Sequence, residues 1–293
     1  MKLLQGWKLL AATLCGTATL FVQTAAAQSA SDDLTLNPKF VAGDTSRPSA
    51  GDDSVGLAKK LANPVASLIS IPFQFNYDAG FGPKDAYKLV LNVQPVVPIT
   101  LNEHWNLIVR TIVPIVYQDS IADGINSKLG LGDTVQSFFF SPKEPSSGGW
   151  IWAVGPVFLW PTATDETLGA QQWGAGPTAL LLKQQNGFTY GALVNHIWSY
   201  ANAGSENEVN ATFVQPFLAY TWPTATTVTV NTESTYDWNS SHWVVPLNLQ
   251  VSQLVKFDKQ PVQFAIGPRY YAERPEGGPE WGIRFTVTFL FPK

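Results

Sequence analysis

Apolar and polar residues alternate along most of this chain with a period of two. In residues 67–78, SLISIPFQFNYD, Ile71 and Phe73 fall on one face of an extended chain, while Gln74 and Asn76 fall on the other. Such alternation is typical of a β-strand whose two faces meet different surroundings. The pattern recurs along most of the chain that follows.

The alternation predicts twelve strands. They cover residues 67–78, 87–99, 105–118, 131–141, 150–160, 173–183, 188–200, 209–221, 226–237, 243–256, 261–272 and 281–291. Most have at least the roughly 9–11 residues that a tilted strand needs to cross a bilayer. Short connections such as TLNEH and FDKQ alternate with longer polar ones such as DSIADGINSKLG and ERPEGGPE. We therefore predict an all-β fold, a transmembrane antiparallel up-and-down β-barrel of about 12 strands with both termini in the periplasm.

Tryptophans lie near the ends of these strands. The residues that we predict at the two membrane interfaces are Trp105, Trp150, Trp160, Trp173, Trp198, Trp222, Trp243 and Trp281, and Trp152 and Trp238 have similar positions. A bilayer attracts the indole ring to its interface, where the ring and its N–H meet different media. The core of a soluble β-protein would instead bury these rings near strand centres.

The first residues form a separate region. Residues 1–27 combine Lys2, Lys8, an apolar run and a small residue at position 27, which predicts a secretory signal peptide. Residues 28–63 are predicted to be a mobile leader followed by a short amphipathic helix in GLAKKLAN, and residues 64–293 to be the outer-membrane barrel. The helix could rest against the barrel mouth or act as a plug. Cys15 is the single cysteine, so the rest of the chain has no disulfide or cysteine metal site.

Composition narrows the class of protein. Charged residues make up 14 % of the chain, against roughly 25 % in soluble domains. The mean hydropathy is only +0.01, and no apolar run beyond the signal is long enough for a membrane helix. The net charge of −4 gives no basic face for nucleic acid. A soluble periplasmic β-sandwich remains the alternative fold.

The final segment and the prolines add two further expectations. WGIRFTVTFLFPK alternates up to Phe291 and looks like the signal that the barrel-assembly machinery recognises in outer-membrane proteins.

Prolines inside the predicted strands lack the N–H of a ladder, so we expect bulges or breaks in pairing. These prolines are Pro72, Pro95, Pro98, Pro114, Pro156, Pro177, Pro216, Pro246 and Pro268. They could shape a constriction or adjust curvature.

Several longer stretches resemble a known family. The stretches are LAKKLANPVASLISIPFQFNYD, LNEHWNLIVRTIVPIVYQ, GLGDTVQSFFFSPKEP, GWIWAVGPVFLWPTATDETLGAQQWGAGPTALLLKQ, YGALVNHIWS and FTVTFLFPK. They resemble a family of Gram-negative outer-membrane proteins classed as transporters, grouped with proteins of the phenol meta-cleavage pathway and sometimes mislabelled neuromedin U. The resemblance covers residues 56–293 and implies passage of small molecules, aromatic ones included.

The polar strand faces supply the candidate site. We predict that they line the lumen, with Asp78, Lys88, Asn92, Arg110, Asn231, Glu233, Asp237, Asn248, Lys256, Arg269 and Arg284. The predicted function is a channel for passive uptake of small, weakly polar or aromatic molecules. The alternatives are an interior filled by its own side chains and a non-transporting barrel that is structural or binds a partner.

No catalytic arrangement is apparent. His104, His196 and His242 lack the serine spacing expected of a barrel lipase, so we predict no enzyme activity and no cofactor or metal. The expected partners are outer-membrane lipid, the barrel-assembly machinery and a small solute, and the oligomeric state stays open.

Overall fold

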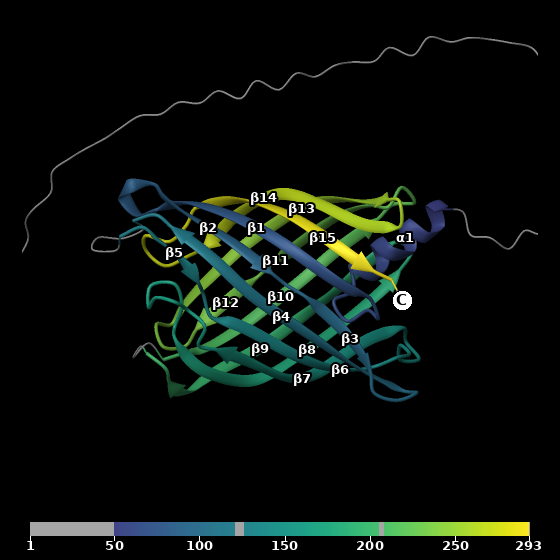
Figure 1. The fold of residues 1–293 in the computed structure, drawn as a ribbon, viewed down its shortest axis with the longest axis horizontal. Helices are drawn as coiled ribbons and strands as arrows, with labels where there is room; N and C mark the ends of the chain where they lie inside the picture. The colour runs from purple at the N-terminus through teal and green to yellow at the C-terminus, as the bar shows by residue number, and fades with distance from the viewer. Residues whose placement is uncertain (1–49, 121–125, 205–207, 293) are drawn as a thin grey trace, which may run out of the picture. The chain divides into compact units, whose positions relative to one another are not determined.

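The computed structural model describes residues 50–120, 126–204 and 208–292. The predicted signal peptide and residues 28–49 of the predicted leader lie outside this part. One helix precedes fifteen strand segments and a short 3-10 turn, η1 (Gly82–Lys84) (Figure 1). The helix and strands are α1 (Ala50–Leu61), β1 (Ile69–Phe81), β2 (Ala86–Val93), β3 (Val96–Thr100), β4 (Trp105–Gln118), β5 (Lys128–Leu131), β6 (Thr134–Pro142), β7 (Trp150–Trp160), β8 (Gln172–Gln185), β9 (Phe188–Asn202), β10 (Asn210–Thr221), β11 (Thr226–Thr232), β12 (Ser234–Asp237), β13 (His242–Phe257), β14 (Gln260–Glu273) and β15 (Trp281–Phe291).

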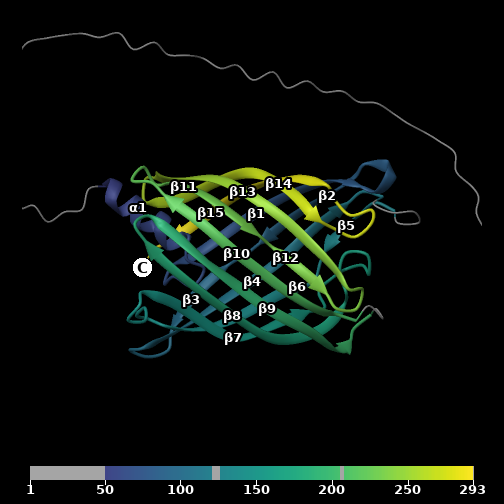
Figure 2. The same cartoon turned by 180° about the vertical axis from the view of Figure 1, so that it is seen from behind.

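The segments form one closed antiparallel barrel. When β2 with β3, β5 with β6, and β11 with β12 are each counted as one strand, every strand pairs with the strands before and after it in the chain. The barrel closes where β1 pairs with β15, from Ile69 opposite Phe291 to Ala79 opposite Trp281. Figure 2 shows the tilted strands from the other side. Three strands are each divided into two segments, namely β2 with β3, β5 with β6, and β11 with β12, so the barrel has 12 strands. The predicted fold and strand number are confirmed.

Each divided strand is interrupted opposite a proline of a neighbouring strand. The break between β2 and β3 faces Pro72, whose carbonyl accepts a hydrogen bond from the Gln94 N–H at 2.9 Å. The break between β5 and β6 faces Pro114, which accepts from Gly132 at 2.9 Å. The break between β11 and β12 faces Pro216 of β10. Because proline has no N–H, regular pairing cannot continue at these points. The predicted breaks are confirmed at these three places, whereas Pro98 pairs with Ile108 in regular register.

Strand pairing is also irregular at other prolines. The register between β13 and β14 shifts between Val245 and Pro246, which is a β-bulge. In β8 and β14 a glycine comes before the proline, and a Cβ added to Gly176 or Gly267 would overlap the backbone of the adjacent strand. Pairing is missing beside both positions. A side chain is therefore excluded where a neighbouring carbonyl approaches closely.

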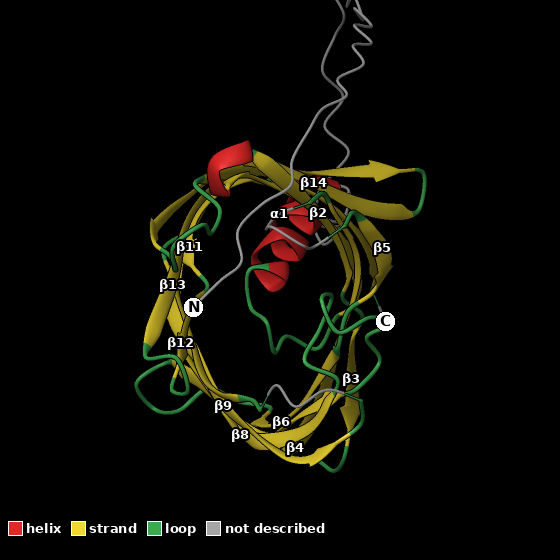
Figure 3. Ribbon diagram, turned by 90° about the vertical axis from the view of Figure 1, so that its left-hand side faces the viewer, coloured by secondary structure: helices red, strands yellow, loops and turns green. Residues whose placement is uncertain are grey.

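Helix α1 begins earlier than the sequence predicted. Its residues 50–55 were assigned to the mobile leader, which is wrong, since the helix starts at Ala50. Asp53 near its start and Lys59 and Lys60 in its last turn have the charges that suit the helix dipole. Figure 3, a view along the barrel, shows α1 within the ring of strands. Ala58 packs there against inward-facing apolar residues of β13 and β15.

The outer surface of the barrel is apolar. Many large side chains point away from the lumen, and five of them are between 40 % and 57 % exposed, namely Leu181, Val194, Leu218, Val251 and Ile266. So much exposed apolar surface is unusual for a soluble monomer and suits contact with hydrocarbon. Among the described residues, no helix has the length and apolar character required to cross a membrane.

Candidate functional site

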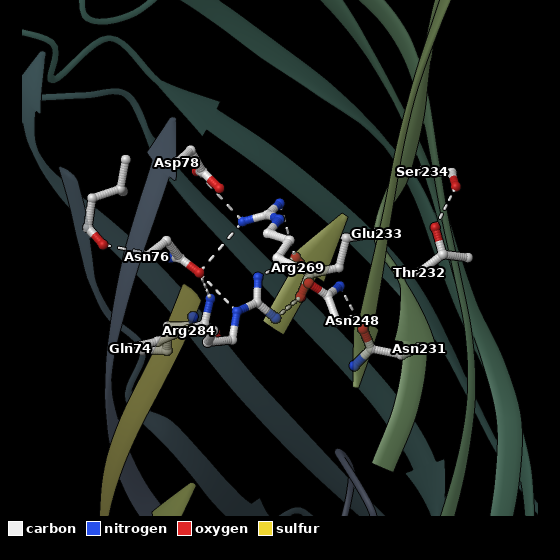
Figure 4. A network of polar contacts seen from close by, with 12 residues as sticks. Gln74, Asn76, Asp78, Asn231, Thr232, Glu233, Ser234, Asn248, Arg269 and Arg284 are labelled. Carbon is white, nitrogen blue, oxygen red and sulfur yellow. Dashed lines mark hydrogen bonds and ion pairs between the residues drawn. The ribbon is translucent and has the colours of Figure 1, made fainter. Parts of the chain in front are cut away.

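A cluster of ion pairs joins distant strands inside the barrel (Figure 4). Glu233 lies in the break between β11 and β12, so its side chain is free of the regular strand geometry. Its carboxylate accepts two hydrogen bonds from Arg284 of β15, at 2.8 and 2.6 Å. Arg269 of β14 approaches the same carboxylate at 3.6 Å. The strand break thus places one carboxylate between two guanidinium groups.

The opposite side of this cluster comes from β1. Arg284 also donates from Nε to Asn76 Oδ1 at 2.7 Å, and its side chain is only 2 % exposed. Arg269 lies 3.7 Å from Asp78 and over the ring of Tyr271. Asp78 is directly opposite Lys88 in the β1–β2 register. The cluster therefore connects β1 with β14 and β15, across the closure of the barrel. Both arginines have a carboxylate partner.

Four further residues predicted for the lumen lie in three other places. Asn248 donates to Asn231 at 2.8 Å on the adjacent strand. Asp237, at the end of β12, accepts from the Asn239 N–H and the Ser240 hydroxyl of the following loop. Lys256 lies at the opposite end of the barrel, 3.8 Å from Asp53 of α1. The last two residues therefore do not belong to the central cluster.

Arg110 of β4 differs from the other two arginines. Its Nη2 donates to the side-chain oxygen of Gln94 at 2.9 Å. Gln94 lies in the break between β2 and β3, so a strand interruption again supplies the partner. Among the described residues no carboxylate comes within ion-pair distance of Arg110. Within the described part of the chain, Gln94 is thus the one hydrogen-bonded partner of this guanidinium.

Arg110 borders the main cavity of the lumen, which has a volume of about 330 Å³. Its polar lining consists of Gln74, Asn92, Gln94, Arg110, Ser137, Asn195, Gln215, Glu233 and Thr235. Its apolar lining consists of Ile112, Val135, Leu159, Leu193, Ile197, Val209, Ala211 and Phe213. Three of the larger apolar residues belong to β9 and β10, which are not neighbours of β4, and we call these three the apolar wall: Leu193, Ile197 and Phe213. Asn195 lies between the first two of them in β9. A cavity of this size and mixed lining can hold one small molecule.

Two smaller cavities continue from this one toward the end that carries α1. One of about 170 Å³ is bordered by Arg110 and Gln94, and one of about 180 Å³ lies on the β10–β14 side. Gln215 of β10 borders all three cavities. Arg110 and Gln215 therefore lie where the main cavity meets the smaller ones.

The segment after α1 lies between the two smaller cavities. Leu61 and Pro64 border both of them. Val65 is 5 % exposed and belongs to a buried cluster with Ile108, Leu182 and other inward-facing residues. The Gln184 amide of β8 donates to the Lys59 carbonyl at 2.8 Å. Of the two interpretations of this helix, the contacts favour a segment that occupies the lumen.

A connection at the other end also folds inward, which the sequence did not predict. The loop between β7 and β8 reaches back to β4, where Gln118 donates to the Thr167 hydroxyl at 3.1 Å. Asp133, in the break between β5 and β6, accepts from the Ala163 and Gln171 N–H groups at 3.0 and 2.9 Å. Lys128 and Asp165 form an ion pair beside it. The density of Thr, Asp and Gln in PTATDETLGAQQ was the available signal.

The predicted interface tryptophans lie near both ends of the barrel. Trp105 contacts Trp152 at one end, with ring centroids 5.7 Å apart. Trp160 contacts Trp173 at the other end, with centroids 5.5 Å apart. The rings exposed by more than a third are those of Trp150, Trp173, Trp198, Trp222, Trp238, Trp243 and Trp281. Their contact with a membrane interface stays a prediction.

The histidines have other partners than a catalytic serine. His196 Nδ1 lies 2.7 Å from the Thr212 hydroxyl, and its ring contacts Trp198 on the outer face. His242 Nδ1 lies 2.6 Å from the Ser240 carbonyl oxygen. Within residues 50–120, 126–204 and 208–292, no group of three or more His, Cys, Asp or Glu side chains could hold a metal ion.

Comparisons with known proteins identify the fold. No protein-family description and no curated protein matches the sequence. Among solved structures, an outer membrane channel from Pseudomonas putida F1 is similar with a TM-score of 0.59 and 12 % identity, over 77 % of this chain and 96 % of that one. At this identity the likeness concerns the fold alone.

Two other barrels are less similar. Outer membrane phospholipase A from Escherichia coli has a TM-score of 0.43 and 9 % identity, over 80 % of this chain and 98 % of that one. The β domain of a Bordetella autotransporter has a TM-score of 0.42 and 10 % identity, over 77 % and 100 %. These TM-scores are too low to support any functional inference, the enzyme included.

Proposed function

We propose that this protein is an outer-membrane channel for passive uptake of small, weakly polar or aromatic molecules. The observation that carries the proposal is the main cavity of the lumen, whose lining combines polar and apolar residues, with two smaller cavities beyond it. A purely polar pore would suit sugars, whereas this lining pairs polar groups of a solute and covers its apolar body.

Three further features support the proposal. The barrel fold is shared with an outer membrane channel. The apolar outer surface suits a bilayer. The resemblance of the sequence to proteins grouped with phenol meta-cleavage supports phenols as test solutes.

Single-channel recording in planar bilayers tests the proposal. The purified protein is expected to give reproducible conductance steps, and liposomes that contain it should swell faster than protein-free liposomes in phenols and short fatty acids. Glucose should produce a smaller increase in swelling. A protein without conductance steps and without any increase in swelling would instead support the alternative, a structural or partner-binding barrel.

We also propose that the chain reaches the outer membrane after cleavage behind residue 27, with help from the barrel-assembly machinery. Phe291, near the end of β15, is the residue that we expect this machinery to recognise. Fractionation on a sucrose gradient and N-terminal sequencing test both points. We expect the protein in the outer-membrane fraction with Gln28 first, and a lower yield there for Phe291→Ala. Protein that stays soluble in the periplasm would contradict the proposal.

A further inference from the structure

Charge is unevenly distributed around the main cavity. Arg269 and Arg284 are neutralised by Glu233 and Asp78, as described above. Arg110 has a neutral amide as its one hydrogen-bonded partner among the described residues. Glu233 borders the same cavity but is already paired with Arg284 and Arg269, so the Arg110 guanidinium retains most of its attraction for an anion. The cavity thus carries an unneutralised positive charge on one wall.

The position of Arg110 makes this charge accessible to a solute. The residue borders both the main cavity and the cavity of about 170 Å³ that lies toward α1. Gln94 holds one terminal nitrogen at 2.9 Å and thereby fixes the orientation of the group. Since a guanidinium has five N–H donors in a planar fork, the others can bind both oxygens of a carboxylate.

The apolar wall, on β9 and β10, has a different character, although Asn195 and Gln215 of the same strands also border the cavity. Leu193 and Ile197 of β9 and Phe213 of β10 contribute apolar side chains to it. A sugar would leave hydroxyl groups unpaired against this wall, which is unfavourable. An organic cation would be repelled by Arg110. A molecule with a carboxylate at one end and a ring or short hydrocarbon chain at the other matches both walls.

We propose that the main cavity binds and passes small amphipathic monocarboxylates, with the carboxylate on Arg110 and the apolar body against Leu193, Ile197 and Phe213. The inference rests on the proposed channel function and names its substrate class. One cation and a volume of about 330 Å³ fit a single monoanion of the size of benzoate. Glu233 nearby limits the strength of binding, so the solute can leave again.

Current block and reversal potentials in planar bilayers test the proposal. Benzoate, benzyl alcohol and benzylammonium share one ring and differ in charge. Added to KCl, benzoate is expected to reduce the wild-type single-channel current at concentrations about 10-fold lower than the other two, because of the charge-assisted hydrogen bond to Arg110. A potassium benzoate gradient should give a reversal potential that shows benzoate permeation.

Variants assign the effect to the cavity. Arg110→Gln should lose the preference for benzoate, while Arg110→Lys should keep part of it through its charge. Arg274→Gln is the matched control, because this arginine pairs with Glu280 in an exposed loop. Phe213→Ser should reduce the block by benzoate and leave any block by acetate unchanged, which tests the apolar wall separately.

The outcomes are distinguishable. Wild-type channels that respond equally to the three ring compounds would overturn the carboxylate proposal and leave the channel function standing, even without data from variants. An Arg110→Gln channel that conducts and keeps the benzoate preference would also overturn it. A wild-type protein without any conductance would overturn the channel function itself, and this inference with it.

Discussion

Replacement of Glu233 with glutamine should strongly destabilise the barrel. The wild-type carboxylate accepts two hydrogen bonds from Arg284, which is 2 % exposed, and faces Arg269 at 3.6 Å. Removal of one partner from a buried ion pair costs about 3–5 kcal/mol, because the other charge stays buried without compensation. Asn76 and Asp78 still contact the two arginines. We therefore expect a loss of about 3 kcal/mol in the free energy of unfolding, at the lower end of that range.

Reversible guanidinium unfolding from lipid vesicles, followed by tryptophan fluorescence, measures the effect. Glu280→Gln is the matched control, since the Arg274–Glu280 pair has an equal distance of 2.6 Å but side chains 32 % and 56 % exposed. Exposed pairs contribute roughly 0.2–1 kcal/mol. Equal effects of Glu233→Gln and Glu280→Gln would refute the reasoning.

A double variant separates the two causes of the loss. In Glu233→Leu/Arg284→Met both partners become apolar, so no buried charge of this pair is left without compensation. We expect it to be more stable than Glu233→Leu alone. A double variant less stable than the single one would show that the pair itself, and not the uncompensated charge, determines the stability.

Three other predictions concern the segment after α1, the close approach of strands at Gly267, and the Lys128–Asp165 ion pair. Val65→Asp should release the segment after α1 and raise the single-channel conductance, whereas Gly56→Ser, where a Cβ meets no atom within 4 Å, should leave it unchanged. Gly267→Ala should lower the yield of folded, heat-modifiable barrel on gels, because the added Cβ overlaps the adjacent strand; a normal yield would contradict this. The hydrogen bond from Lys128 lowers the pKa of Asp165 to about 2, so the ionised form is present above the ordinary value of about 3.9 and is lost as the pH falls through about 2. A spin label in the β7–β8 loop should therefore keep its mobility from pH 7 to 4 and gain mobility only near pH 2, and a transition near pH 4 would oppose this.

The strands were predictable from the sequence because their faces alternate between apolar and polar residues. The segment 105–118 was predicted with the bounds that β4 has. The segment 131–141 was predicted too short, since β5 begins at Lys128. The Gly, Asn and Ser residues of the stretch before Leu131 predict a loop there instead of a strand. The prolines in the sequence indicated that strand pairing would be interrupted. They did not indicate which neighbouring strand would be divided.

The candidate site was predictable only in part. Alternation indicated that Arg110, Arg269 and Arg284 point inward, but all three appear equivalent in the sequence. The structure shows that Arg269 and Arg284 form ion pairs and that, within the described residues, Arg110 does not. This difference depends on Glu233, which lies more than thirty residues from each arginine and comes close to Arg284 only in the closed barrel. Of the apolar wall, Leu193 could be recognised in the sequence as an apolar residue on an inward strand face. The position of this wall relative to Arg110 requires the strand order.

Cysteine accessibility tests the central claim, that solutes pass through the cavity beside Arg110. Asn195 and Val194 are adjacent in β9, and Asn195 borders the cavity whereas Val194 is 40 % exposed on the outer surface. Each is changed to cysteine in a protein with Cys15→Ser, and a negatively charged thiosulfonate reagent is added during single-channel recording. We predict that modification of Asn195→Cys lowers the conductance and that Val194→Cys shows no change. An unchanged conductance at Asn195→Cys after mass spectrometry has verified its modification, or equal losses at both positions, would contradict this account.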